Sequence, residues 1–263
     1  MSVHTAPCGA CGLCRRGNEN LCAEAMSSMT LGGFAEAVLL PRPVVEINAF
    51  LKPPSLAFAE AAFLEPLSCV VQGLEKVALR AGESVVVIGA GPIGLMQQIL
   101  VKARGAGKVI VVGRRAARLD AARALGAHAV LDEQSLPGES LAGAVRGLTD
   151  GLGADVVIEC AATPEAWEQA VTLVRKGGRV LWFGGCKPGT TVTLDTHRVH
   201  YDEITTMGVF HFAPRSVQEA QRLLASGEVN VAPLVSGSLP LSDLPRALDL
   251  IGRGEGIKYA LLP

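Results

Sequence analysis

The sequence has almost no imbalance of charge and no long hydrophobic run. Its 24 basic and 25 acidic residues leave a formal net charge of −1, which argues against nucleic acid or an anionic membrane surface as the main partner. The longest segment free of charged, amide and imidazole side chains, 84–96, is too short to span a bilayer. The first residues, MSVHTAPCGACG, lack a signal-peptide pattern, so we predict a cytoplasmic protein.

The composition and length of the chain are those of a folded globular protein. Hydrophobic residues make up 49% of the 263 residues and charged residues 19%. This composition supplies enough apolar surface for a core, so wholesale disorder is excluded. The length fits one large domain or two modest ones, and we find neither an internal repeat nor a low-complexity tract.

The chain changes character along its length. In residues 1–55 a cysteine-rich stretch precedes GGFAEAVLLPRPVVEI, which is typical of short strands broken by prolines. Residues 56–80 have helical periodicity, and Pro66 is predicted at the first position of a helix. Between 185 and 203 the chain is expected to be irregular. The tail holds one further helix candidate, SVQEAQRLLASG.

From Glu83 onward apolar strands alternate with amphipathic helices. Runs of Val and Ile joined by helices indicate a parallel sheet buried on both faces, an α/β doubly wound fold. The expected strands are 84–88, 108–112, 128–131, 154–160, 179–184 and 203–210.

A glycine-rich turn directly follows the first of these strands and opens a helix. In Gly89-Ala90-Gly91-Pro92-Ile93-Gly94, the first glycine permits a tight turn. The second lets the backbone approach a pyrophosphate, and the third lets helix and strand pack closely. A lone GxGxxG is a weak signal, but the strand, the helix and the following βαβ units stand where the motif requires them. We therefore predict dinucleotide binding.

The end of the second strand bears on which dinucleotide is bound. An acidic residue there would bind the ribose 2′-hydroxyl of NAD. This strand ends instead in Gly113, Arg114 and Arg115. Arginines can bind a 2′-phosphate bidentately, which favours NADP over NAD, although a solvated basic loop would have the same sequence.

Four of the seven cysteines lie within the first 22 residues, at Cys8, Cys11, Cys14 and Cys22. Four thiolates this close together can surround one Zn²⁺ in a closed site, whose role would be structural. An iron–sulfur cluster is the alternative, since the first spacings also suit a ferredoxin, but the fourth does not. The other three, Cys69, Cys160 and Cys186, are read as apolar core or strand-end residues.

Together these pieces resemble the zinc-containing medium-chain alcohol dehydrogenases, and within them the sorbitol and threonine dehydrogenase branch. The resemblance extends over nearly the whole chain, in the family's order. The matching stretches are APCGACGLCRRGNENLC, GGFAEA, EPLSCVVQGLEK, GAGPIG, GADVVIECA, RKGGRVLWFGG and HYDEITTMG.

The resemblance implies a division of the chain into three parts. Residues 1–80 would form a partial GroES-like catalytic domain with a structural zinc lobe and linking helices. Residues 81–212 would form the Rossmann NAD(P)-binding domain. Residues 213–263 would return to the catalytic domain.

The resemblance also implies roles for single residues. The four lobe cysteines would hold structural zinc, and Gly113 replaces the family's usual aspartate. Glu65 stands where the family has a glutamate in or near the catalytic zinc shell, although a plain helix cap would look the same. Because it precedes Pro66, we expect Glu65 outside helical geometry. The predicted cofactor-binding residues are Gly89, Gly91, Pro92, Ile93, Gly94, Gly113, Arg114, Arg115, Arg118, Phe183, Gly184, Gly185, Val209 and Phe210.

The family's remaining catalytic zinc ligands come from segments upstream of the cysteine lobe, and neither motif is present in this sequence. We therefore expect the chain to be N-terminally truncated, and a catalytic zinc in it is doubtful. His197, His200 and His211 are predicted to be ordinary polar residues. His4 has no cysteine before it at a suitable spacing, so we do not assign it as a ligand. One zinc per chain would fit the four-cysteine lobe alone, whereas two would indicate a second metal site.

The predicted function is a zinc-dependent alcohol or polyol dehydrogenase that transfers a hydride between a secondary alcohol and NAD(P). The expected partners are a small-molecule alcohol or polyol and further copies of the chain in a homo-oligomer. The alternative is a non-catalytic NAD(P)-binding redox sensor or subunit. A zinc-ribbon interaction module joined to a Rossmann domain is a third, weaker hypothesis.

Overall fold

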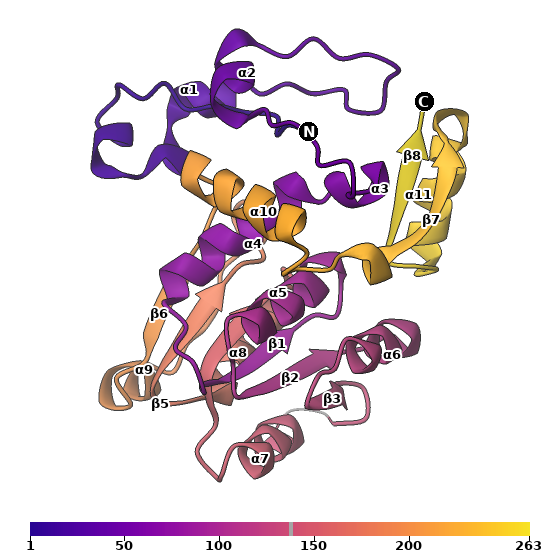
Figure 1. The fold of residues 1–263 in the computed structure, drawn as a ribbon. Helices are drawn as coiled ribbons and strands as arrows, with labels where there is room; N and C mark the ends of the chain where they lie inside the picture. The colour runs from indigo at the N-terminus through magenta and orange to yellow at the C-terminus, as the bar shows by residue number, and fades with distance from the viewer. Residues whose placement is uncertain (137–138) are drawn as a thin grey trace. The chain divides into compact units, whose positions relative to one another are not determined.

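The computed structural model describes residues 1–136 and 139–263 of the chain (Figure 1). These residues form two compact units, one made of 1–72 and 210–263, the other of 73–209. The helix α4 (Leu64–Val77) begins in the first unit and ends in the second. Each unit is described separately below.

The 73–209 unit is built on a six-stranded parallel sheet. Its strand order, β3-β2-β1-β4-β5-β6, is that of a doubly wound dinucleotide-binding fold. The predicted α/β fold is confirmed, and the strands lie close to their expected positions. They are β1 (Ser84–Ile88), β2 (Lys108–Gly113), β3 (Ala129–Asp132), β4 (Ala154–Glu159), β5 (Val174–Trp182) and β6 (Thr205–Gly208).

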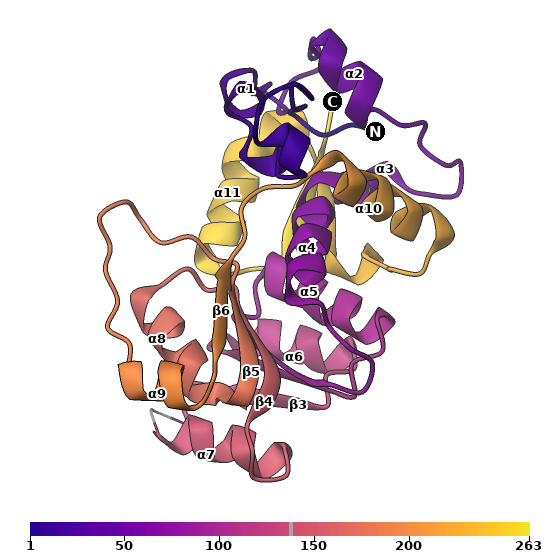
Figure 2. The ribbon, with the colours of Figure 1, turned by 90° about the vertical axis from the view of Figure 1, so that its left-hand side faces the viewer.

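Helices cover both faces of this sheet, as Figure 2 shows. On one face α5 (Pro92–Ala103) packs beside α6 (Ala116–Ala124), and on the other α7 (Glu139–Leu148) packs beside α8 (Pro164–Leu173). A further short helix, α9 (Thr196–Tyr201), lies in a connection that we expected to be irregular. Because every central strand is buried on two sides, its sequence is continuously apolar rather than alternating.

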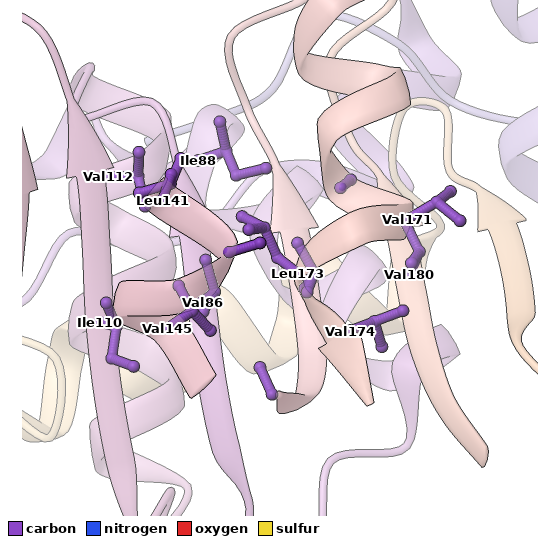
Figure 3. Close-up of a cluster of buried hydrophobic side chains, with 14 of the residues drawn as sticks. Val86, Ile88, Ile110, Val112, Leu141, Val145, Val171, Leu173, Val174 and Val180 are labelled. Atoms are coloured by element: carbon purple, nitrogen blue, oxygen red, sulfur yellow. The ribbon is translucent and has the colours of Figure 1, made fainter. Parts of the chain in front are cut away.

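The core beneath α7 and α8 shows this directly (Figure 3). Ile88 of β1 and Val112 of β2 point to the same side of the sheet and belong, with Leu141 of α7, to one cluster, and all three are buried. The alternate residues Val85 and Val87 are equally buried on the opposite face. Both faces of the central strands β1 and β2 are therefore closed to water, and their ends are the part available to a ligand.

The unit of 1–72 and 210–263 contains short helices and a two-stranded parallel sheet, β7-β8. The predicted tail helix is present as α10. The elements are η1 (Cys14–Arg16), η2 (Glu19–Leu21), α1 (Ala23–Ser27), α2 (Arg42–Asn48), α3 (Phe58–Ala61), α10 (Pro214–Ser226), η3 (Ala232–Leu234), β7 (Val235–Pro240), η4 (Leu241–Asp243), α11 (Leu244–Arg253) and β8 (Lys258–Leu262).

The short strands expected in residues 32–47 do not form, so that prediction was wrong. The segment is extended and irregular as far as Pro41, and α2 follows with Pro43 in its first turn. A strand needs a neighbour for its backbone groups. In the described residues near this segment the only pairing is the isolated bridge between Ser2 and Ala49. Pro43 holds its own φ near the helical value, which favours the helix instead.

The helix prediction for 56–80 is confirmed in kind but not in its start. The α4 helix begins at Leu64, so Pro66 occupies its third position rather than its first. An amide in the first turn has no intrahelical partner, so the proline removes no bond there. Among the described residues, no helix is long and apolar enough to cross a membrane.

A charged contact ties β1 to the start of β4 and β5. The Asp155 carboxylate accepts hydrogen bonds from the backbone and hydroxyl of Ser84, both at 2.7 Å, and from Arg175 at 2.6 Å. Burial opposes ionisation of this carboxyl, but the bonds from Ser84 and Arg175 outweigh it and lower the pKa of Asp155. The ionised carboxylate therefore stabilises the fold.

We predict that Asp155→Asn destabilises the protein by about 1–3 kcal/mol at neutral pH. A carboxyl whose pKa is lowered by folding stabilises the protein above its unfolded pKa of about 4, and loses that effect as the pH falls through the folded pKa. The difference in free energy of unfolding between wild type and variant, measured with urea, should therefore be constant above about pH 5 and become smaller in acid.

The matched control is Asp120→Asn, whose carboxylate is 69% exposed and pairs only with Arg123 on its own helix. That variant should change stability by no more than about 0.5 kcal/mol. An Asp155→Asn variant as stable as the control at pH 7 would contradict the assigned role.

Candidate functional site

The glycine-rich turn joins β1 to α5 through a very close backbone approach. Gly89 has φ 100°, a left-handed value that favours glycine. A side chain at Gly94 would place its Cβ 1.8 Å from the Gly89 carbonyl oxygen, so only glycine fits there. Gly91 is the N-cap of α5, and Pro92 and Ile93 form the helix's first turn. The free amides of that turn can bind an anion.

A cavity of about 290 Å³ adjoins this turn at the carboxyl ends of the strands. In an open parallel sheet this edge is where ligands bind. Six of the predicted cofactor residues line the cavity: Gly89, Gly91, Gly113, Arg114, Arg115 and Arg118. The other lining residues are Ile88, Ala90, Glu133, Cys160, Ala161, Thr163 and Ala166.

Gly113, at the end of β2, is closely surrounded. A Cβ there would lie 2.9 Å from a methyl group of Leu119 and 3.1 Å from the Cβ of Ala90. A larger residue at this position would require the Leu119 side chain to shift and would pack tightly against Ala90. The glycine therefore suits the present packing of β2 against the glycine-rich turn.

Arg118 lies across the cavity from the turn. Its Nη1 is 3.7 Å from where a Cβ of Gly91 would be, and its buried Nε has no hydrogen-bond partner among the described residues. Burial, and then the positive charge of Arg115, lower the pKa of Arg118. A half-buried guanidinium whose buried Nε is an unused donor, beside a helix N-terminus, fits an anionic ligand group.

Glu133 is a lining residue that was not predicted from the sequence. It follows β3, and its carboxylate accepts a 2.7 Å hydrogen bond from Nε of Arg114. This carboxylate is only 18% exposed. The sequence signal was available but weak: an acid after the third strand, at the same edge of the sheet as the turn. The acid missing from the end of β2 is thus present on the neighbouring strand.

The other predicted cofactor residues of this unit lie outside the described lining of the cavity. Phe183, Gly184 and Gly185 follow β5, and the amides of the first two donate to the Glu159 carbonyl, each at 3.0 Å. A Cβ at Gly184 would lie 2.7 Å from the Ala162 amide. Val209 directly follows β6. Phe210 belongs to the other unit and is 53% exposed.

The four cysteines of the 8–22 segment converge, although none of the chain's cysteines forms a disulfide. Their sulfur atoms all lie within 4.8 Å of one another. Cys8 is 3.6 Å from Cys22 and 3.9 Å from Cys14, and Cys11 is 3.5 Å from Cys14 and 3.9 Å from Cys22. The edge of a zinc–thiolate tetrahedron is about 3.8 Å long, so the site fits one ion.

These distances also discriminate between the two metal hypotheses. The thiolates of an iron–sulfur cluster surround several atoms and stand farther apart than the ligands of one ion. In this segment the 3_10 turns η1 and η2 bring the sulfurs together around a single point. A backbone hydrogen bond from Cys8 lowers the pKa of Cys22 to about 6, whereas burial raises that of Cys14 to about 12. Zinc binding should therefore release protons.

A second group of possible metal ligands lies elsewhere in the same unit. One ligand atom each from His4, Glu65 and His211 lie within 4.8 Å of one another. Neither histidine was predicted to be a ligand, and no spacing in the sequence links positions so far apart. Glu65 was expected outside helical geometry, but it lies in the first turn of α4, so that expectation was wrong.

Polar side chains lie next to His211 and Glu65. Nε2 of His211 is 2.8 Å from the Thr5 hydroxyl, and burial, then the charge of His4, lowers the pKa of His211 to about 4. The Cys69 thiol donates to Glu65 at 3.5 Å. Burial lowers the pKa of Lys258, and the negative charge of Glu65 opposes that shift.

The fold, the cavity at the glycine-rich turn and the four converging cysteines define a class: a Rossmann dinucleotide-binding protein with a tetrathiolate metal lobe. The family model of the zinc-binding dehydrogenases matches residues 92–226. The chain belongs to this family of NAD(P)-dependent oxidoreductases, which confirms the family and the enzyme class predicted from the sequence.

Curated relatives are named for a polyol and for a ketose. A sorbitol dehydrogenase of Halalkalibacterium halodurans is 32% identical over 261 residues, covering 97% of this chain and 73% of the relative. A D-xylulose reductase A of Aspergillus niger is 31% identical over 258 residues, covering 96% and 70%. A zinc-binding dehydrogenase structure from Sinorhizobium meliloti, bound to NADP, superposes with a TM-score of 0.89 at 31% identity, covering 100% of this chain and 76% of that one.

We predict that Cys22→Ser lowers the zinc content by one ion per chain and lowers the melting temperature by several degrees. A serine oxygen is a poor zinc ligand, and loss of a structural zinc removes its contribution to folding. Metal analysis and thermal unfolding with and without chelator measure both effects. Cys186→Ser, which is outside the cluster, should change neither; equal zinc in the two variants would contradict the site.

Proposed function

We propose that this protein is a zinc-dependent dehydrogenase that oxidises a secondary alcohol of a polyol, with NADP preferred over NAD. The observation that carries the proposal is the cavity at the glycine-rich turn, where a helix N-terminus and the guanidinium of Arg118 face one another across Gly91. The relative named for the polyol sorbitol and the reductase named for the ketose D-xylulose support the substrate class.

The chain's own residues bind and orient the cofactor. The first-turn amides of α5 that follow Pro92, which itself has no N–H, would hold the pyrophosphate, and Gly91 would let the phosphates come close to the backbone. Arg118 lies beside the adenosine end, with Arg115 next to it. The nicotinamide side would be lined by Phe183, Gly184 and Gly185 at the end of β5 and by Val209 after β6. Phe210 is a further residue proposed to contact the cofactor.

When bound, the nicotinamide carries the hydride, and a catalytic zinc polarises the alcohol oxygen. Glu65 contributes a half-buried carboxylate at the start of α4 that holds the metal or its water in place. The four lobe cysteines hold a structural zinc, which leaves no open position for substrate. Assembly into a homo-oligomer and a cytoplasmic location stay predictions.

The preference for NADP rests on Arg115 and Arg118 rather than on Arg114. Arg114 is already paired with Glu133, so its guanidinium is not free for a 2′-phosphate. Glu133 places a negative charge in the same cavity, which favours a ribose hydroxyl over a phosphate. The two arginines outweigh this charge because Arg118 has an unsatisfied buried donor at the cavity.

We predict that the purified protein reduces NADP⁺ with a polyol such as sorbitol or xylitol, measured by the absorbance of the reduced nicotinamide. Glu65→Gln should lower kcat/KM by at least about tenfold, the lower limit of the usual effect of changing a group that orients a metal site. Glu36→Gln, at an exposed position, is the control. Cofactor binding without turnover of any alcohol would favour the non-catalytic redox sensor instead.

Arg118→Ala should weaken NADPH binding by about tenfold, the effect of losing roughly 1.4 kcal/mol of charge-assisted hydrogen bonding, and should weaken NADH binding less. Arg123→Ala, on the same helix but paired with Asp120 at 2.7 Å, should leave both affinities unchanged. Fluorescence titration with the two cofactors measures each constant. Tighter NADH than NADPH binding in the wild type would overturn the assigned preference.

A further inference from the structure

A cation site distinct from the tetrathiolate is suggested by three residues that are far apart in sequence. His4 precedes the cysteine lobe, Glu65 opens α4, and His211 precedes α10. All three are half-buried, and one ligand atom of each lies within 4.8 Å of the other two. Two imidazoles and one carboxylate form a ligand set used by zinc and by other divalent transition metals.

The spacing of the three ligand atoms is close to what a metal requires. In a tetrahedral zinc site, nitrogen and oxygen ligands are separated by about 3.3–3.6 Å. The upper limit of 4.8 Å exceeds this by about 1.2–1.5 Å. Rotation about side-chain bonds can bring the three groups closer to one ion.

Buried amide side chains hold the segments that carry the two histidines. Asn48, which is fully buried, donates to the Thr5 carbonyl at 2.7 Å, directly after His4. Asn20, which is 2% exposed, donates to the Phe210 carbonyl at 2.8 Å, directly before His211. Both histidine backbones are thus anchored from the interior of the unit. A site whose ligands are held in advance loses less entropy on binding.

His211 shows two further features of a positioned ligand. Its φ of 59° is left-handed, a conformation uncommon for a residue other than glycine and associated with functional positions. One of its ring nitrogens, Nε2, lies 2.8 Å from the Thr5 hydroxyl. A metal-bound imidazole characteristically makes such a hydrogen bond through one nitrogen and binds the metal through the other.

We propose that His4, Glu65 and His211 bind a second divalent cation, with Zn²⁺ as the best fit. Three protein ligands leave one tetrahedral position open, in contrast to the closed set of four thiolates. That position can take a water molecule or the oxygen of an alcohol. The site therefore deepens the proposed dehydrogenase function, but its existence is tested by metal content alone.

Lys258 is the alternative partner of Glu65. Its ammonium group is near enough to the carboxylate for the charge of Glu65 to raise its pKa against the effect of burial. It also lies 5.1 Å from the centre of the Phe63 ring, which gives it a second interaction. If Lys258 alone satisfied Glu65, neither histidine would affect metal binding, and variants can distinguish these two arrangements.

The test is the metal content of the purified protein after chelation, reloading with excess Zn²⁺ and desalting. The wild type should retain two zinc ions per chain. His4→Ala, Glu65→Gln and His211→Asn should each retain one; asparagine is chosen because it tolerates a left-handed backbone. His197→Ala and His200→Ala, in α9, are the controls and should retain two.

Loading with Co²⁺ shows which site is lost. Thiolate-to-cobalt charge-transfer absorption marks the tetrathiolate, and it should be unchanged in the three variants while the total cobalt falls from two to one. This retained signal also shows that the variants are folded. One metal per chain in the wild type, or two in every variant, would overturn the proposal.

The outcome is separable from that of the proposed function. Two metals in the wild type without turnover of any alcohol would leave the second site standing and remove the dehydrogenase assignment. If the wild type turns over an alcohol while holding only one, thiolate-bound metal, the dehydrogenase assignment stands and the second site is removed. The histidine variants then decide whether any second ion is held by the predicted ligands.

Discussion

The contact between the glycine-rich turn and the first turn of α5 is the constraint on which the cofactor site depends. The Gly89 carbonyl oxygen occupies the space that a side chain at Gly94 would need, because a Cβ at Gly94 would lie only 1.8 Å from it. Because the helix lies this close to the strand, its free amides face the carboxyl edge of the sheet. Gly113 and Arg118 are placed around the same point, one by packing against Ala90 and the other across Gly91. Anion binding here is thus a consequence of backbone geometry.

Local patterns were enough to predict the sheet and the turn. Each central strand is a short Val/Ile run buried on two faces, and each is followed by a helix, so the signal lies within a few neighbouring residues. The tetrathiolate was predictable for the same reason, since its four ligands fall within one 8–22 segment. Neither prediction required knowledge of contacts between distant parts of the chain.

The errors arose where the structure depends on distant partners. Residues 32–47 have the composition of strands, but a strand forms only when another strand is available to pair with it, and α2 forms instead. The group of His4, Glu65 and His211 joins three segments separated along the whole chain. Glu133 reaches the cavity only because β3 lies beside β2 in the sheet. No periodicity or motif spacing reports such contacts.

The ion pair between Arg114 and Glu133 has a consequence for how cofactor preference can change over time. A single substitution at Arg114 would leave the mostly buried carboxylate of Glu133 without its positive partner at the edge of the cavity. A single substitution at Glu133 would leave the guanidinium of Arg114 unpaired there. Either change alone alters both the stability of the loop and the charge that the ribose meets. The two positions are therefore expected to be replaced together, so that the charge contributed by this ion pair changes through two compensating mutations.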